Sequence, residues 1–204
     1  MKTLYFLRHG LSRANNLSLV NGKVDDPLTD RGRKQARAAG RIIAAGDIRF
    51  DACFVSHWRR AQETAELAFP DARFTVDARL GETDPGEAAE VTFAELPKRY
   101  PEFKLPFDPL RPYPGGESHQ QLYNRSVEWF EEAESSLPQE AIVLAVSHGG
   151  PICSILQYIC KVDISYFPMF VPSNASFSKI IKGDTSRWKL QYFSLSPISD
   201  IEKS

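Results

Sequence analysis

Cysteine is scarce in this sequence. The three cysteines, Cys53, Cys153 and Cys160, form an odd set in which no two have C-x-x-C spacing. A disulfide scaffold needs pairs of cysteines and a structural zinc site needs closely spaced ligand pairs, so neither is expected and no metal site is predicted. Cys153 and Cys160 lie in one stretch with a helical pattern, where packing in the core explains both.

Long hydrophobic runs are also lacking. No segment stays apolar over the about 18 residues that a membrane-spanning helix needs. Arg8, His9 and Arg13 interrupt the apolar start of the chain, which makes it too short for a signal sequence. We therefore expect a soluble, cytoplasmic protein that has no membrane partner.

Neither sign of charge dominates. The 25 Lys+Arg residues are balanced by 26 Asp+Glu residues, which leaves a formal net charge of -1. Without a strong positive field the chain is not expected to recruit nucleic acid, so any recognition of phosphate must be local. The length of 204 residues and the hydrophobic content of 42% suit one sizeable core. We expect a single domain over residues 1–204, and the sequence does not indicate an oligomeric state.

Apolar runs alternate with helical patterns along the chain. Residues 3–7, 51–56 and 141–147 are apolar and partly β-branched, and a helical pattern follows each of them. Residues 72–77 have the pattern of a further strand. Such alternation is typical of an α/β fold, here a three-layer α/β/α sandwich around a mostly parallel central sheet.

Helix boundaries can be predicted from capping residues. Thr29 can cap a helix that Gly46 ends, and further helices are expected to start near Trp58, Glu117 and Pro151. From residue 174 onward, polar and apolar residues alternate on both sides of a turn at residues 182–184. We expect this segment to form an antiparallel hairpin at the edge of the sheet.

Proline is concentrated in one part of the chain and excludes a long helix there. Aromatic and basic side chains are interspersed with the prolines, a composition that favours a folded lid over a flexible linker. The lid insertion is expected at about residues 83–118. Half of the 14 prolines of the chain lie in it: Pro85, Pro97, Pro101, Pro106, Pro109, Pro112 and Pro114.

Two histidines directly follow predicted parallel strands. His9 follows the first strand and His148 follows the third, and ligands of open α/β sheets bind beyond the carboxyl ends of the strands. Either histidine alone could be a hydrogen-bonded structural residue, but their shared setting predicts a common cleft. His57 and His119 lack this setting and are expected to be structural or solvated.

The residues beside these histidines suit an oxyanion. Arg8 precedes His9, and a guanidinium can donate two parallel hydrogen bonds to phosphate, although a surface ion pair is the alternative for any single arginine. Gly149 and Gly150 allow backbone N–H groups to approach a ligand, and Pro151 suits a first helical turn. This segment is a plausible anion site, although a tight turn would explain the same residues.

Together these residues resemble the histidine phosphatase superfamily, which includes cofactor-dependent phosphoglycerate mutases and fructose-2,6-bisphosphatase. The resemblance spans most of the chain and keeps the order of the family's motifs. The matching segments are R-H-G with Ser12 and Asn15, G-K-V-D-D-P-L-T from Gly22, S-H-W-R-R-A from Ser56, L-G-E ending at Glu82, P-G-G-E-S from Pro114, S-H-G-G from Ser147 and N-A-S from Asn174.

The resemblance implies a role for each catalytic position. His9 would attack phosphorus and form a phosphohistidine that water later hydrolyses. Glu82 would donate a proton to the leaving oxygen and then accept one from water. The register of the third motif selects Arg60 and not its neighbour Arg59. No metal or cofactor is expected, because the phosphoryl oxygens would be bound by Arg8, Arg60, His148 and N–H groups near Gly149.

Four further residues are expected to bind the phosphate or the first atoms of the substrate. These are Ser12 and Asn15, which match the first motif, Gly22, which begins the second, and Asn21, which precedes it on the same loop. Polar loop residues often cap helices or close turns instead, so that alternative remains open for each of them.

The resemblance predicts an enzyme and leaves two activities open. The first is a metal-independent phosphomonoesterase that hydrolyses a small phosphorylated metabolite. The second is a phosphoglycerate mutase-type phosphotransferase, which must shield its phosphoenzyme from water. We favour the phosphatase because the chain is short and its lid carries only scattered basic residues. A phosphate-binding sensor without turnover is less favoured, because every expected catalytic residue is present.

Overall fold

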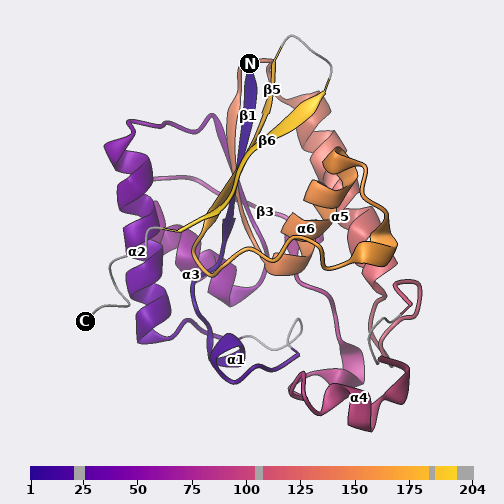
Figure 1. The fold of residues 1–204 in the computed structure, drawn as a ribbon. Coiled ribbons are helices and arrows are strands. Elements are labelled where there is room, and N and C mark those ends of the chain that lie inside the picture. Colours follow the sequence, from indigo (N-terminus) through magenta and orange to yellow (C-terminus); the bar gives the residue numbers. More distant parts are fainter. Residues whose placement is uncertain (21–25, 104–107, 184–186, 197–204) are drawn as a thin grey trace.

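A six-stranded sheet forms the centre of the computed structural model, which describes residues 1–20, 26–103, 108–183 and 187–196 (Figure 1). The strand order is β3-β2-β4-β1-β5-β6. The pairs among β1 to β4 are parallel, whereas β5 is antiparallel to both β1 and β6. The strands are β1 (Lys2–Arg8), β2 (Ala52–Val55), β3 (Thr75–Val76), β4 (Ile142–Ser147), β5 (Phe177–Lys182) and β6 (Trp188–Leu195).

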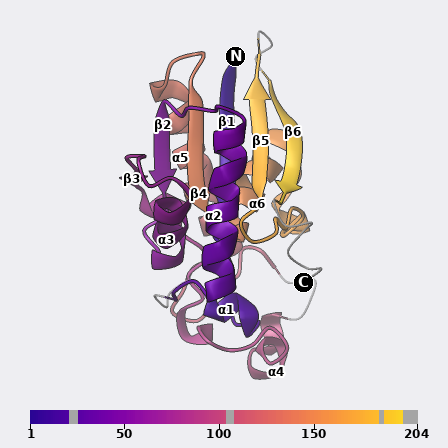
Figure 2. The same ribbon diagram turned by 90° about the vertical axis from the view of Figure 1, so that its left-hand side faces the viewer.

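Helices cover both faces of this sheet. On one face lie α2 (Asp30–Ala45) and α3 (Arg59–Ala68), and on the other lie α5 (His119–Ser136) and α6 (Gly149–Cys160) (Figures 1 and 2). The fold is therefore the three-layer α/β/α sandwich that the sequence predicts, with a mostly parallel sheet and an antiparallel edge. No helix in the described parts of the chain has the length and apolar character to cross a membrane.

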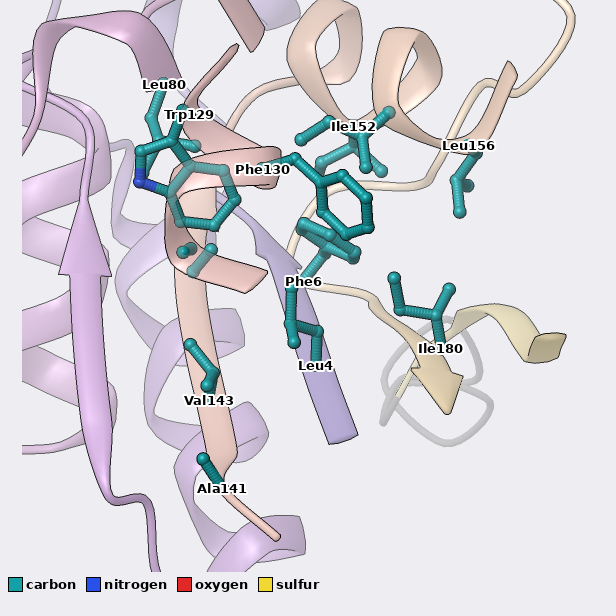
Figure 3. Packing of buried hydrophobic residues seen from close by; sticks show 13 residues of the cluster. Leu4, Phe6, Leu80, Trp129, Phe130, Ala141, Val143, Ile152, Leu156 and Ile180 are labelled. Atoms are coloured by element: carbon teal, nitrogen blue, oxygen red, sulfur yellow. The ribbon is translucent and has the colours of Figure 1, made fainter. Parts of the chain in front are cut away.

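Alternation along β1 explains how one strand supports two cores. Successive side chains of a strand point to opposite faces of the sheet. Leu4 and Phe6 accordingly pack with Trp129 and Phe130 of α5 (Figure 3), whereas Tyr5 and Leu7 belong to the core under α2 and α3. Because both faces of β1 are covered, the strand is apolar from Leu4 to Leu7, and it ends at Arg8.

The predicted helix boundaries hold to within two residues. Thr29 caps α2 by accepting a hydrogen bond from Gly32 N, and Gly46 is its C-cap. Helix α5 begins just after its N-cap Ser118. Helix α6 begins at Gly149, two residues before the predicted start at Pro151. A proline is tolerated there because the first helical turn leaves its N–H groups without intrahelical acceptors.

The two strand predictions outside the central strands differ in outcome. The strand expected at residues 72–77 is reduced to β3, Thr75–Val76, which pairs on one side only, with β2, and is exposed. The C-terminal hairpin is confirmed as β5 and β6, although residue 184 of its turn lies outside the described residues.

The lid packs below the sheet, beyond the end of β1 (Figure 2). Its described part contains only short helical segments, of which α4 (Leu96–Arg99) is one. Val20 joins the lid's own small core, and its backbone exchanges hydrogen bonds with Glu90 and Val91. Arg13 of α1 (Arg13–Asn16) adds an ion pair to Glu90 at 2.6 Å. The lid is thus a folded cover and not a linker.

Candidate active site

His9 and His148 lie side by side where β1 and β4 end. Arg8 is paired in register with Ser147, and His9 N donates a hydrogen bond to Ser147 O at 3.0 Å. The imidazole centroids are 4.9 Å apart, and both side chains are buried. The structure therefore brings the two strand-end histidines together as predicted.

The tautomer of His9 follows from its hydrogen bonds. Nδ1 lies 2.7 Å from Gly10 O, and a carbonyl oxygen can only accept, so Nδ1 carries the proton. Nε2 is left with its lone pair, toward which Arg60 Nε donates at 3.3 Å. Burial, and then the charges of Arg60 and Arg8, lower the pKa of His9 well below its usual value. The side chain is a neutral imidazole with a nucleophilic Nε2.

Arg60 and Arg59 differ in position although they are neighbours. Both lie in the first turn of α3, but Arg60 is buried beside His9 whereas Arg59 is exposed. Thr64, one turn further along α3, accepts a hydrogen bond from Gly10 N at 3.0 Å. Helix α3 is therefore docked against the backbone that carries His9, and this fixes the position of Arg60.

His148 is the N-cap of α6. Its Nε2 is 2.8 Å from Ser56 Oγ, and its Nδ1 is buried without a hydrogen-bond partner among the described residues. Burial and the charge of Arg60 are the main causes that lower the pKa of His148. The ring is neutral in this state and keeps a polar atom available to a ligand.

Glu82 enters the site from the segment after β3. Its carboxylate accepts hydrogen bonds from Gly150 N at 3.2 Å and from Thr83 N at 2.9 Å. A Cβ atom at Gly149 would lie 3.8 Å from both Arg8 Cζ and Glu82 Oε2, so these side chains converge on the start of α6. A Cβ atom at Gly150 would lie 2.2 Å from Glu82 Oε1, and this close approach explains the glycine.

Arg8 is held by the segment between α6 and β5. Its Nη1 donates to Pro172 O at 2.5 Å. Its Nε is buried and lacks a hydrogen-bond partner within the described residues. One edge of the guanidinium is thus fixed by backbone, and a donor of the same group stays available to an anion.

These groups form one cluster of a neutral imidazole, two guanidinium groups, a second imidazole and a carboxylate, in which His9, Arg60 and His148 are buried and Arg8 and Glu82 are half-buried. The model of the histidine phosphatase superfamily (branch 1) matches residues 4–195 of the chain. The chain belongs to this superfamily.

Known proteins similar to this superfamily member include both mutases and phosphatases. A 2,3-bisphosphoglycerate-dependent phosphoglycerate mutase of Methylobacterium sp. (strain 4-46) is 32% identical over 178 residues, which cover 82% of this chain and 85% of the relative. The 6-phosphofructo-2-kinase/fructose-2,6-bisphosphatase of Gallus gallus is 34% identical over 82% of this chain and 34% of its own length. The structure of mycobacterial glucosyl-3-phosphoglycerate phosphatase with VO3 superposes with a TM-score of 0.85 at 29% identity, covering 96% of this chain and 100% of that chain.

The polar loop residues of this superfamily member are only partly described. Ser12 caps α1, and its Oγ accepts from Asn15 N at 3.3 Å, which is the capping alternative that the sequence left open. Asn174 Nδ2 donates to Asn15 Oδ1 at 3.0 Å and to His9 O at 3.1 Å. The predicted contacts of Asn21 and Gly22 lie outside the described residues.

The other two histidines have the surroundings that were expected of them. His119 is buried between aromatic rings, with its centroid 4.5 Å from that of Phe167 and 5.8 Å from that of Tyr113. Burial lowers the pKa of His119 to about 4. His57 is exposed, and its ring lies tilted against that of Trp58 with the centroids 4.8 Å apart. The structure gives neither of them the setting of His9 and His148.

The buried histidines predict a loss of stability in acid. His9, His148 and His119 stay neutral in the folded chain below pH 6.5, whereas the unfolded chain binds protons there. The free energy of unfolding is therefore expected to fall as the pH is lowered from 6.5 toward 4, by up to about 1.4 kcal/mol per pH unit for each histidine.

Denaturant unfolding of the wild type and of His119→Phe between pH 7 and pH 4.5 measures this slope. Phenylalanine keeps an aromatic ring beside Phe167 but cannot titrate. The variant should lose about 1.4 kcal/mol per pH unit of the slope, because one of the three groups is gone. Equal slopes in the two proteins would contradict the prediction.

Proposed function

We propose that this chain is a phosphatase that hydrolyses a small phosphorylated metabolite through a covalent phosphohistidine on His9. The observation that carries the proposal is the state of His9: its Nδ1 proton is engaged by Gly10 O, and its Nε2 lone pair faces the guanidinium of Arg60. A neutral nucleophile beside fixed positive charge is what attack on a phosphate dianion requires.

The first step transfers the phosphoryl group to the enzyme. The Nε2 lone pair of His9 forms a bond to phosphorus as the bond to the leaving oxygen breaks. Arg8, Arg60, His148 and the N–H group of Gly149 bind the non-bridging oxygens, on which negative charge is concentrated during transfer. The proton of Glu82 moves to the leaving oxygen, and the product departs as an alcohol.

The second step reverses the role of Glu82. Its carboxylate accepts a proton from the attacking water, the water oxygen bonds to phosphorus, and the bond to Nε2 breaks. Inorganic phosphate and neutral His9 are restored. The hydrogen bond from Gly150 N aims the carboxylate at the start of α6, where the phosphoryl group would be bound in both steps.

A phosphoglycerate mutase-type phosphotransferase is the second candidate. It is favoured by curated mutases such as the one of Methylocella silvestris, which is 29% identical over 82% of this chain. A mutase must bind a second acidic group of its substrate. Two basic residues of the lid, Lys98 and Arg99, are exposed, and Arg13 is engaged by Asp26 and Glu90. This distribution of charge supports hydrolysis over transfer.

Two activities measured on one preparation distinguish the candidates. Phosphate release from a panel of phosphorylated metabolites is compared with isomerisation of 3-phosphoglycerate in the presence of 2,3-bisphosphoglycerate. The phosphatase proposal predicts that the best substrate of the panel releases phosphate at least about 100-fold faster than 3-phosphoglycerate is isomerised, a difference of about 3 kcal/mol in activation free energy. Isomerisation faster than every hydrolysis would overturn it.

A further inference from the structure

Arg125 lies behind the segment that carries Glu82. From α5, its Nη1 donates to the backbone carbonyl oxygens of Arg79 and Gly81, both at 2.8 Å. Its Nη2 donates to the carbonyl oxygen of Glu82 at 3.0 Å. A single side chain thus binds three carbonyl groups in the four residues that lead up to and include Glu82.

Glu117, the N-terminal neighbour of the α5 cap, fixes this guanidinium. Its carboxylate accepts from Arg125 Nη2 at 2.5 Å and from Nε at 3.1 Å. The same carboxylate accepts from Asp84 N at 2.9 Å, and Glu117 N donates to Asp84 O at 2.9 Å. The pair therefore holds the Glu82 segment on both sides of Glu82.

The hydrogen-bonding capacity of Arg125 is fully used by these contacts. A guanidinium has five N–H donors in a planar fork, and the two carbonyl bonds of Nη1, the two bonds of Nη2 and the bond of Nε account for five. Lysine has three donors in a different geometry and cannot make this set. The exposed fractions of the Arg125 and Glu117 side chains are 23% and 17%, so the contacts are partly shielded from water.

Upstream of Glu82 the chain is anchored at Leu80, which is buried in the core and whose carbonyl oxygen accepts from Ser147 Oγ at 2.7 Å. The carbonyl groups of Gly81 and Glu82, beyond this anchor, are held by Arg125. The Glu82 segment follows a short 3-10 turn, Ala78–Leu80, and β3 upstream has only two residues. The carboxylate of Glu82 is aimed by Gly150 N, but its main chain is held by Arg125. Without the guanidinium, three carbonyl oxygens would have to find new donors, and the backbone at Glu82 would shift.

We propose that Arg125, held by Glu117, is a positioning residue that sets the place of the Glu82 carboxylate for proton transfer. The inference rests on the proposed function, in which Glu82 protonates the leaving oxygen. Arg125 itself touches neither the phosphoryl group nor the leaving group. Its loss should impair protonation of the leaving oxygen and leave phosphate binding by Arg8 and Arg60 largely intact.

The dependence on the leaving group separates this role from a general structural one. p-Nitrophenolate leaves without a proton, whereas an alkoxide such as that of glycerol 2-phosphate needs one. The value of kcat/KM reports steps up to the first irreversible one, here transfer to His9. Both esters are assayed with the wild type, Glu82→Gln, Arg125→Met and the double variant.

The expected pattern is specific. Glu82→Gln should lower kcat/KM for glycerol 2-phosphate by about 10²- to 10⁴-fold and for p-nitrophenyl phosphate by less than about tenfold. Arg125→Met should lower kcat/KM for glycerol 2-phosphate by about 10- to 100-fold, because a small displacement of the acid suffices for such a loss. It should lower kcat/KM for p-nitrophenyl phosphate by less than about threefold. In the Glu82→Gln background, Arg125→Met should add less than about threefold, since both changes remove one function.

Arg79→Met is the matched control. Arg79 has a similar exposed fraction of 24% and ion pairs of its own with Asp77 and Glu132, but its side chain makes none of the contacts to the Glu82 segment. Its values of kcat/KM for the two esters should stay within about threefold of the wild type. Losses as large and as selective as those of Arg125→Met would overturn the inference.

Other outcomes are equally decisive. Equal losses on both esters in Arg125→Met, or full additivity with Glu82→Gln, would show that Arg125 acts on the fold alone and would overturn the inference. If Glu82→Gln lowers both esters equally, the acid role of Glu82 in the proposed function fails as well. Should Arg125→Met not fold, Arg125→Lys and Glu117→Gln take its place. Both must then lose more activity on glycerol 2-phosphate than on p-nitrophenyl phosphate, although with smaller losses. If neither variant shows this selectivity, the inference is overturned.

Discussion

His9→Ala is expected to abolish turnover, with kcat/KM lowered by at least about 10⁴-fold, the order lost when a covalent nucleophile is removed. The cause is the loss of the Nε2 lone pair, which the hydrogen bond of Nδ1 to Gly10 O directs toward the site. The phosphate-binding groups Arg8 and Arg60 remain, so the variant should still bind inorganic phosphate. Phosphate release and isothermal titration with phosphate measure the two effects.

His9→Asn is the companion variant. An asparagine amide can still donate to Gly10 O and fills much of the buried space of His9, but it is not a nucleophile. It should lose activity to the same extent while its thermal unfolding stays close to that of the wild type. Turnover by His9→Asn within tenfold of the wild type would contradict a nucleophilic role for this side chain.

Arg60→Ala is expected to lower kcat/KM by about 10²- to 10³-fold, whereas Arg59→Ala should stay within about threefold of the wild type. The two residues are neighbours on α3, but only Arg60 is buried and has its Nε within 3.3 Å of the nucleophile. Without the Arg60 guanidinium, the negative charge that develops on the phosphoryl oxygens loses one of the hydrogen-bond donors that stabilise it.

The pair of variants also tests which arginine of the motif is used. Both substitutions remove an arginine from the first turn of the same helix, so general effects on α3 are shared. Steady-state kinetics with p-nitrophenyl phosphate measure kcat/KM for both variants. Comparable losses at the two positions, or a larger loss at Arg59, would be incompatible with the geometry around His9.

The sequence predicts elements that have a regular apolar pattern and residues that directly follow a strand. Apolar runs 3–7 and 141–147 predict the two central strands, because strands buried on both faces must be apolar throughout. His9 and His148 follow these strands directly, which predicts a common cleft at the carboxyl edge of the sheet. That β1 and β4 are neighbours in the sheet comes from the structure. The cap at Thr29 marks the start of α2 because its chemistry is local.

Supporting contacts cannot be predicted in the same way. Arg125 and Glu117 act through backbone carbonyl and N–H groups, which every residue has, so no pattern of side chains marks their targets. The contact of Arg8 with Pro172 O and that of Asn174 with His9 O join segments far apart in sequence. Strand β3 was overestimated because alternation cannot show that a strand pairs on one side only.

Trapping of the phosphoenzyme tests the central claim most directly. The wild type is mixed with a turnover substrate, quenched in alkali within milliseconds, digested and examined by mass spectrometry. The account predicts one phosphoryl group on the peptide that contains His9, stable in alkali, lost in acid and absent from His9→Asn. A phosphoryl group on another residue, or steady turnover with no phosphoenzyme at any time of quench, would contradict it.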